Sequence, residues 1–556
     1  MSKKMNEALE QVIEQVENKQ SFLLEAGAGS GKTRTLIETL QHILEKHSQQ
    51  LLKNNQLIAC ITYTNVAKDE IKERIDNNPL VLVLTIHEFL WHVMKNFQKE
   101  LKDEVIEYNN TKARNPVENL SEILKYEKID YSQYGRKFEN GKITHEDVLA
   151  FSSKLFSGYS KISQMVANKF PYIFVDEYQD TEERTVELLI DHLLARNIGS
   201  VTMGFFGDSM QKIYNQGIGE IQSKHLKSIT KQDNFRCSKA VIELLNKIRP
   251  ELIQNAAGEN LEGSITFYSC NSDLQSQNNF NKVLNDLEKK GWDFQSNETE
   301  ILDAKILFLT HRGIGAKLGY QELLQVYNII PFGRDQLFNK DELFARFILE
   351  KVEKLAELFT QKRYGEFISI LGIEDYKINR HSDKQIIADL MSELDKKRKN
   401  QSIKEVLEFV FENRLLGKPA KIEEYIQKLN DEGNENKKEF YDALMSVKYS
   451  EIISLYQYIE ESTPFSTKHG VKGAEFKNVL VVIDDASWNQ YKFNDVFGGI
   501  KSNQGRYDRT RNLLYVCCSR AKDNLAILSL SGMDNDAMVT INKWFSQRII
   551  DVSKLT

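Results

Sequence analysis

Short apolar runs alternate with stretches of helical periodicity along much of the chain. After the run Phe22–Leu24, apolar side chains recur at the spacing of a helix face, at Leu36, Ile37, Leu40, Ile43 and Leu44. Alternation of this kind is typical of a parallel sheet flanked by helices, so an α/β fold is predicted. Further strands are predicted at Leu57–Thr62, Leu80–Leu84, Tyr172–Val175, Val201–Phe206, Ile306–Thr310, Val479–Ile483 and Leu525–Leu528.

Two long intervals interrupt this alternation. The interval Leu90–Ile143 is polar and lysine-rich. The interval Arg312–Glu460 is rich in helical spacing, as at Leu343, Phe347, Val352, Leu355 and Leu358. We therefore expect two mainly helical insertions.

Composition restricts the class of protein without choosing a function. The chain has 556 residues, of which 41% are hydrophobic and 28% charged, as in ordinary soluble proteins of two or more domains. No apolar run approaches the roughly 18 residues of a membrane span, and Met1–Glu10 is polar, so we expect a cytoplasmic protein without membrane contact. The five cysteines show no Cys-x-x-Cys spacing, which favours buried free thiols over zinc or disulfides.

Charge leaves nucleic-acid binding open. The net charge of −6 excludes a uniformly basic, histone-like chain, but a local cationic groove is enough to bind DNA. The densest basic run is Lys396–Lys399. Both a solvated helix face and a duplex or partner contact fit this run.

The segment AGAGSGKT, Ala26–Thr33, lies between a predicted strand and a predicted helix. Its backbone amides can surround a polyphosphate at a helix N-terminus, Lys32 can reach the outer phosphates, and the Thr33 hydroxyl can bind Mg²⁺. The first position of the usual pattern is glycine, whereas here it is Ala26. The segment predicts ATP binding.

A second acidic segment, FPYIFVDEYQDT, ends an apolar strand in two adjacent carboxylates. Asp176 is placed to hold Mg²⁺ with Thr33, and Glu177 to polarise the attacking water, because phosphoryl transfer depends on charge neutralisation and positioning. Isolated Asp-Glu pairs are common at strand ends. This pair indicates a catalytic site because it follows a phosphate loop in the same chain.

The run Asp176–Thr181, DEYQDT, resembles the second motif of superfamily 1 helicases of the UvrD, Rep and PcrA type. Six further segments resemble motifs of that family in the family's order. They are ITYTNVAKDEI (61–71), TIHEFL (85–90), FFGDSMQKIY (205–214), NFRCS (234–238), TKHGVKGAEF (467–476) and RNLLYVCCSRA (511–521). Single matches carry little information, but this order and spacing make an accidental match improbable.

The resemblance implies a role for each matching residue. Gln211, Arg236 and Arg520 are expected at the γ-phosphate, as catalytic residues beside Lys32 and Glu177. The expected nucleotide-binding residues are Gln11, Ala26, Gly27, Ala28, Gly29, Ser30, Gly31, Lys32, Thr33, Arg34, Phe235 and Glu475, with Gln11 and Phe235 at the adenine. The expected DNA contacts are Tyr63, Thr64, Asn65, His87, Tyr214, Thr467 and His469.

The family's fold implies two RecA-like lobes with ATP and Mg²⁺ held between them. The implied domains are 1–89 with 144–231, the insertion 90–143, 232–311 with 461–556, and the helical insertion 312–460. An arginine supplied to a γ-phosphate is worth roughly 10³ to 10⁵ in rate. Lobe opening and closing on single-stranded DNA would drive movement, with 3′ to 5′ polarity implied by the family.

One departure from the family pattern keeps alternative functions open. The family pattern continues after Tyr214 with tryptophan and Arg-Gly, whereas here Asn215–Ile218 follows, so the usual base platform is absent. The resemblance therefore implies either a DNA-stimulated helicase or a helicase-like regulatory subunit, similar to that of Gabija phage-defence systems, which pairs with an OLD-family nuclease. A P-loop kinase is disfavoured because it leaves 61–71 and 467–476 unexplained.

Overall fold

The computed structural model divides the chain into two compact units. Unit 1 comprises 1–266, 490–525 and 534–549, and unit 2 comprises 267–489, 526–533 and 550–556. Each is described by itself. The described residues are 7–113, 116–132, 136–212, 217–270, 276–294, 303–308, 319–331, 333–338, 340–371, 381–431, 433–459, 465–466, 474–485, 491–546 and 548–555.

Unit 1 is organised around a six-stranded sheet in the order β3-β2-β6-β7-β1-β8. Its neighbouring strands all pair in parallel. The strands are β1 (Phe22–Ala26), β2 (Ile58–Thr62), β3 (Val81–Thr85), β6 (Tyr172–Asp176), β7 (Thr202–Gly207) and β8 (Lys227–Lys231). All but the edge strand β8 were predicted, and β8 escaped because its sequence KSITK buries Ile229 as its single apolar side chain.

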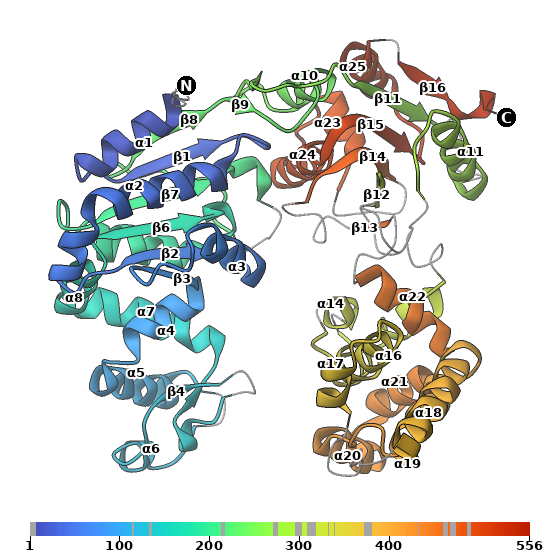
Figure 1. Cartoon of the computed structure of the whole chain (residues 1–556), viewed down its shortest axis with the longest axis horizontal. Coiled ribbons are helices and arrows are strands. Elements are labelled where there is room, and N and C mark those ends of the chain that lie inside the picture. Colours follow the sequence, from blue (N-terminus) through green and yellow to red (C-terminus); the bar gives the residue numbers. More distant parts are fainter. Residues whose placement is uncertain are drawn as a thin grey trace. The chain divides into compact units, whose positions relative to one another are not determined.

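Helices cover both faces of this sheet (Figure 1). Strand β1 shows why: Phe22 and Leu24 join one hydrophobic cluster, while Leu23 joins the other, as the alternation of side chains along a strand requires. One face packs against α1 (Glu7–Glu17), α2 (Lys32–Lys53) and α3 (Asn65–Arg74), and the other against α4 (Ile86–Met94), α7 (His145–Gly158), α8 (Ser160–Lys169) and η3 (Leu188–Leu194). The predicted α/β class is confirmed.

The first interval contributes small elements whose apolar side chains join the second of these clusters. They are α5 (Gln98–Thr111), α6 (Leu120–Ile123), β4 (Asp130–Tyr131), η1 (Phe138–Asn140) and β5 (Lys142–Ile143). The remaining elements of unit 1 are η2 (Tyr178–Asp180), α9 (Glu183–Glu187), η4 (Ser209–Gln211), β9 (Asp233–Asn234), α10 (Lys239–Ile248), β10 (Asn255–Ala256), α23 (Phe493–Gly498), α24 (Gln504–Cys518) and α25 (Asn535–Phe545). The implied four-domain division stays a prediction.

Unit 2 contains most of a second sheet, in the order β13-β12-β14-β15-β11-β16. Strand β12 pairs in parallel with both β13 and β14. The strands are β11 (Ser264–Ser269), β12 (Ala304–Phe308), β13 (Phe465–Ser466), β14 (Phe476–Ile483), β15 (Ala521–Ser529) and β16 (Ile549–Asp551), accompanied by α11 (Ser276–Lys289) and η8 (Val552–Lys554). The predicted strands at 306–310, 479–483 and 525–528 overlap β12, β14 and β15, and residues 309–310 lie outside the described part.

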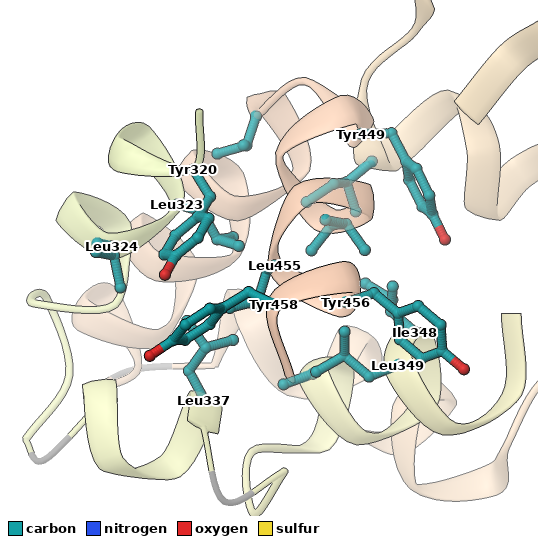
Figure 2. Close-up of a cluster of buried hydrophobic side chains, with 14 of the residues drawn as sticks. Tyr320, Leu323, Leu324, Leu337, Ile348, Leu349, Tyr449, Leu455, Tyr456 and Tyr458 are labelled. Carbon is teal, nitrogen blue, oxygen red and sulfur yellow. The ribbon is translucent and has the colours of Figure 1, made fainter. Parts of the chain in front are cut away.

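The second interval is helical, as its spacing predicted. Its helices are α13 (Gln321–Val326), α14 (Gly333–Phe338), α15 (Leu343–Phe347), η6 (Ile348–Glu353), α16 (Lys354–Thr360), α17 (Tyr364–Ile370), α18 (His381–Asn400), α19 (Ile403–Glu412), α20 (Ala420–Gln427), η7 (Lys428–Asn430), α21 (Glu435–Ser446) and α22 (Tyr449–Ile459). Figure 2 shows part of their core, where Tyr320 and Tyr458 lie with ring centroids 5.9 Å apart. Leu323 and Leu455 are buried beside them.

The basic run Lys396–Lys399 closes α18 and is only partly a charged surface. Arg398 is buried and donates through Nε to Glu353 Oε1 at 2.8 Å, and Tyr449 OH donates to the same oxygen at 2.8 Å. Lys399 pairs with Asp395 at 2.6 Å. We call Glu353, Arg398 and Tyr449 the Arg398 cluster. Buried Arg398 fits neither a solvated helix face nor a duplex or partner contact, whereas both interpretations stay open for the exposed Lys399.

Two further expectations concern the whole chain. All five cysteines are buried and free, as predicted. Within the described residues, no helix combines the length and apolar character that a bilayer crossing needs.

Candidate nucleotide site

The phosphate loop joins β1 to α2 through backbone that glycine favours. Gly29 and Gly31 have φ values of 72° and 78°, in the left-handed region. A Cβ on Gly29 would also lie 2.7 Å from Arg236 Cβ, so this position has no room for a side chain. Ser30 is 1% exposed, and its Oγ has no hydrogen-bond partner among the described residues. A buried hydroxyl of this kind fits a loop that receives a polar ligand such as phosphate.

Lys32 and Glu177 meet directly beside this loop. Lys32 Nζ donates to Glu177 Oε2 at 2.7 Å, and Gln179 Nε2 donates to the same oxygen. Burial would lower the pKa of Lys32, but the charges of Glu177, Asp176 and Asp208 outweigh burial and raise it. Lys32 is therefore positively charged at neutral pH and lies among carboxylates. Phosphoryl transfer uses both kinds of group, a cation at the phosphates and carboxylates that hold Mg²⁺ or position water.

Asp176 lies at the carboxyl end of β6, and Thr33 lies in the first turn of α2. Among the described residues, no group of three or more His, Cys, Asp or Glu side chains makes a metal site by itself. A carboxylate and a hydroxyl do suit Mg²⁺, which usually takes one or two protein ligands together with water and substrate phosphates. The residues present fit that ion.

A second side-chain contact, besides that of Lys32 with Glu177, joins Gln211 and Arg520. Arg520 Nη2 donates to Gln211 Oε1 at 2.9 Å, and Arg520 Nε donates to the Val516 carbonyl at 3.1 Å. The Arg520 side chain is 1% exposed. Burial, and next the nearby charge of Arg236, lower the pKa of Arg520 to about 10, so it keeps its positive charge at neutral pH.

The segment 234–236 closes over the phosphate loop. Asn234 Nδ2 donates to the Ala28 carbonyl at 2.9 Å, and the Phe235 amide donates to the Gly29 carbonyl at 2.9 Å. The Phe235 ring is 51% exposed, unusual for a large aromatic side chain. The structure thus brings Phe235 and Arg236 to the loop and leaves Phe235 half-exposed there.

Several residues that sequence reasoning missed also converge here. Tyr515 OH accepts a hydrogen bond from the Ala28 amide at 3.0 Å. Arg249 pairs through Nη1 with Asp208 Oδ1 at 2.7 Å and through Nη2 with Glu25 Oε1 at 2.5 Å. Glu25 was detectable as a lone charge in the apolar run before the loop. No sequence signal marked Arg249.

Three other predicted nucleotide contacts are exposed, and their roles stay predictions. Gln11 is exposed on α1, and Arg34 is exposed on α2, where it pairs with Glu38 at 2.8 Å. Glu475 is exposed in unit 2, so its relation to Lys32 is not described.

The predicted DNA contacts are only partly visible. Tyr63 is 39% exposed just beyond β2, and the Thr64 hydroxyl accepts from the Ala67 amide at 3.2 Å as the N-cap of α3. His87 stacks on His145 with ring centroids 4.3 Å apart. Burial, and next the nearby His145, lower the pKa of His87 to about 4, so it is neutral at pH 7. Tyr214, Thr467, His469 and the side chain of Asn65 lie outside the described residues.

Comparison with known proteins finds relatives among helicases and a phage-defence protein. Residues 9–216 match the model of an AAA domain. The Gabija protein GajB of Bacillus cereus (strain HuB5-5) is 27% identical over 95% of both chains. A probable DNA helicase II homolog of Mycoplasma capricolum is 22% identical over 91% of this chain and 82% of its own.

Among further relatives, the ATP-dependent DNA helicase PcrA of Staphylococcus aureus (strain Mu50) is 26% identical over 41% of this chain and 37% of its own. The resemblance to UvrD-like superfamily 1 helicases is confirmed. The crystal structure of Pif1 helicase from Candida albicans covers 59% of this chain and 55% of its own, at 12% identity and a TM-score of 0.29. The Mycoplasma and Staphylococcus relatives are DNA helicases by name, and PcrA is named as ATP-dependent.

Proposed function

We propose that this chain is an ATP-dependent DNA translocase and helicase of the UvrD type that moves 3′ to 5′ on single-stranded DNA in the cytoplasm. The observation that carries this proposal is the Arg520–Gln211 contact at 2.9 Å, in the same unit as the Lys32–Glu177 pair at 2.7 Å. These two contacts support a site in which Gln211 senses the γ-phosphate, Lys32 supplies a cation and Glu177 polarises the attacking water.

Hydrolysis follows from the competition between phosphate and Glu177 for Lys32. A γ-phosphate placed on the loop would draw Lys32 Nζ away from Glu177 Oε2, because the phosphate carries more negative charge. Glu177 would then be able to accept a proton from the attacking water. Mg²⁺ held by Thr33 and Asp176 would neutralise phosphate charge when bound.

The arginines supply positive charge that offsets the negative charge of the transition state. Arg520 is already desolvated, so its charge acts at full strength on a nearby phosphoryl group and needs little reorganisation. Gln211 accepts a hydrogen bond from Arg520 and therefore connects the cation to the γ-phosphate position. Arg236, beside the loop at Gly29, adds a second cation.

The decisive experiment measures ATP turnover with and without single-stranded DNA. We expect stimulation that declines steeply with salt, because phosphate contacts release counterions. Glu177→Gln should bind nucleotide without turnover. Duplexes with a 3′ or a 5′ tail then test polarity, and unwinding from the 5′ tail alone would reverse the assignment. ATP turnover by Glu177→Gln at the wild-type rate would refute the proposed catalytic site.

A second candidate function is favoured by the match to GajB over 95% of both chains and by the missing tryptophan platform. In it, the chain is a regulatory subunit in phage defence that senses DNA ends or nucleotides and controls an OLD-family nuclease. Co-expression with such a nuclease, followed by cleavage and strand-separation assays with each protein alone and together, separates the two functions. ATP-dependent control of cutting without strand separation supports the second.

A further inference from the structure

Glu25, Tyr178, Asp208 and Arg249, here called the Arg249 cluster, form a buried network behind the phosphate loop. The Arg249 side chain is 5% exposed and that of Asp208 is fully buried. Arg249 bridges two carboxylates with two different nitrogens, Nη1 to Asp208 at 2.7 Å and Nη2 to Glu25 at 2.5 Å. Tyr178 OH also donates to Glu25. The mechanism above uses none of these four groups.

The cluster leads directly to the γ-phosphate sensor. Gln211 Nε2 donates to Asp208 Oδ2 at 2.8 Å, and Gln211 Oε1 accepts from Arg520 at 2.9 Å. The Asp208 amide donates to Gln179 Oε1 at 3.1 Å, and Gln179 in turn donates to Glu177. Asp208 therefore contacts the sensor Gln211 directly and also contacts Gln179, which donates a hydrogen bond to the water-polarising Glu177.

The donor and acceptor chemistry of this chain fixes the direction of the Gln211 amide. An ionised carboxylate only accepts hydrogen bonds, and a guanidinium only donates them. Gln211 must therefore turn its nitrogen to Asp208 and its oxygen to Arg520. A protonated Asp208 could donate to the Gln211 oxygen instead, and the amide would then present N–H groups to Arg520.

The charge state of Asp208 depends on its counter-ion. Burial raises the pKa of Asp208, and Arg249 opposes that rise. The other charged or titratable groups that face Asp208 are Glu25 from β1, Lys32 from α2, Tyr178 from η2 and Tyr515 from α24. Arg249 is the cation in direct contact with the carboxylate.

We propose that Arg249 is a positioning residue for ATP hydrolysis: paired with Asp208, it keeps that carboxylate a hydrogen-bond acceptor and so holds the Gln211 amide oxygen toward Arg520. The proposal rests on the proposed ATPase function. Arg249 acts through Asp208 and Gln211 and does not itself touch the nucleotide.

The test compares full-length variants by kcat, nucleotide Kd and melting temperature. Arg249→Met removes the charge, Arg249→Lys keeps it, and Asp208→Asn creates a side chain that can both donate and accept. The matched control is Arg398→Met, which breaks a buried arginine–carboxylate pair of the other unit.

We expect Arg249→Met and Asp208→Asn to lower kcat about 10- to 100-fold, the range for a misplaced catalytic group. The Kd of an ATP analogue should change less than about threefold, because only the contact of Gln211 and Arg520 with the γ-phosphate depends on the Arg249–Asp208 pair. Arg249→Lys should recover most of the rate, because it keeps the positive charge beside Asp208. Arg398→Met should melt earlier at unchanged kcat. Equal losses of kcat in Arg249→Lys and Arg249→Met, or a fall in kcat matched by an equal rise in Kd, overturn the proposal.

The pH profile distinguishes positioning from structural damage. In Arg249→Met, kcat should rise with increasing pH more than in the wild type, because burial without Arg249 keeps the pKa of Asp208 raised and a higher pH returns it to its ionised form. The rise should persist in Glu25→Gln/Arg249→Met. A pH-independent loss, or a rise that disappears in the double variant, assigns the effect elsewhere and contradicts the proposal.

A crystal structure of Arg249→Met keeps the inference separate from the proposed function. If the wild type proves to have no ATPase activity, the proposed function fails, and the geometry alone decides the inference. We expect the Gln211–Arg520 contact to be broken or the Gln211 amide reversed. An unchanged contact refutes the positioning role whatever the activity.

Discussion

The Arg249 cluster of unit 1 and the Arg398 cluster of unit 2 have the same chemistry but different surroundings. Each pairs a buried arginine with carboxylate and tyrosine. The Arg398 cluster ends on packed helices, α18, η6 and α22, whereas the Arg249 cluster continues through Asp208 to Gln211 and Arg520. Burial of charge is therefore no sign of function by itself. What matters is the group on which the network ends.

The largest expected effect is at the phosphate loop itself. Lys32→Ala should lower kcat by roughly 10³-fold or more, because a cation that acts on the transferred phosphoryl group is lost. Phosphate release measures this directly. Lys46→Ala, on the exposed side of the same helix α2, is the matched control and should keep wild-type turnover. Comparable losses in both variants would mean that α2 had been damaged as a whole.

Arg520→Ala should follow, with a loss in kcat of about 10²- to 10³-fold and a smaller change in nucleotide affinity. Its charge matters most when negative charge develops in the transition state. Single-turnover hydrolysis together with analogue binding separates the two quantities. A collapse of affinity at unchanged kcat would reassign Arg520 to ground-state binding.

Arg398→Met sharpens the comparison from the other side. Leaving Glu353 buried without its partner should destabilise the protein by about 3–5 kcal/mol, while turnover of the folded protein stays unchanged. Denaturant unfolding followed by circular dichroism measures the loss. Arg398→Met/Glu353→Met should recover much of it, since no uncompensated charge then remains, and failure to recover would point to lost packing instead.

Phe235→Ala should have a more modest effect on nucleotide binding. Stacking on an aromatic ring is worth roughly 1–3 kcal/mol per base, so the Kd for ATP should rise about tenfold. Binding of inorganic triphosphate is the internal control, because it has no base to stack. Equal weakening of both ligands would show that Phe235 supports the loop rather than the base.

The smallest expected effect is at the exposed part of the basic run. Lys399→Ala removes an exposed i,i+4 pair with Asp395 and should change the free energy of unfolding by less than about 0.5 kcal/mol. Its contrast with Arg398, one residue earlier, is the point of the measurement. A large fall in duplex affinity in Lys399→Ala would restore the DNA-contact interpretation of this run.

Sequence patterns predicted the sheet and the loop because both depend on local rules. Apolar runs marked the buried strands, and glycine spacing marked the phosphate loop. Strand β8 was missed because Ile229 is the single apolar side chain in its sequence KSITK. Glu25 and Arg249 were missed because their pairing joins residues that are 224 positions apart, and a single sequence carries no periodicity across such a separation.

The basic run shows a different limit. Four consecutive cations look alike in the sequence, yet helix geometry turns them to different sides, so Arg398 is buried while Lys399 is exposed. The roles of the matched motif residues, the DNA contacts above all, remain predictions. Contacts such as Arg520 with Gln211 support them without testing them.

Glu177 follows β6 with a φ of 51°, a backbone conformation that costs an L-residue about 1–2 kcal/mol. Glycine or asparagine would relax that turn. A descendant of this chain that no longer needed to hydrolyse nucleotide would therefore gain robustness by drifting away from glutamate here. A glutamate retained at this turn in related sequences would therefore indicate that nucleotide hydrolysis is still selected. Its replacement would indicate a protein that has lost hydrolysis and kept only the fold.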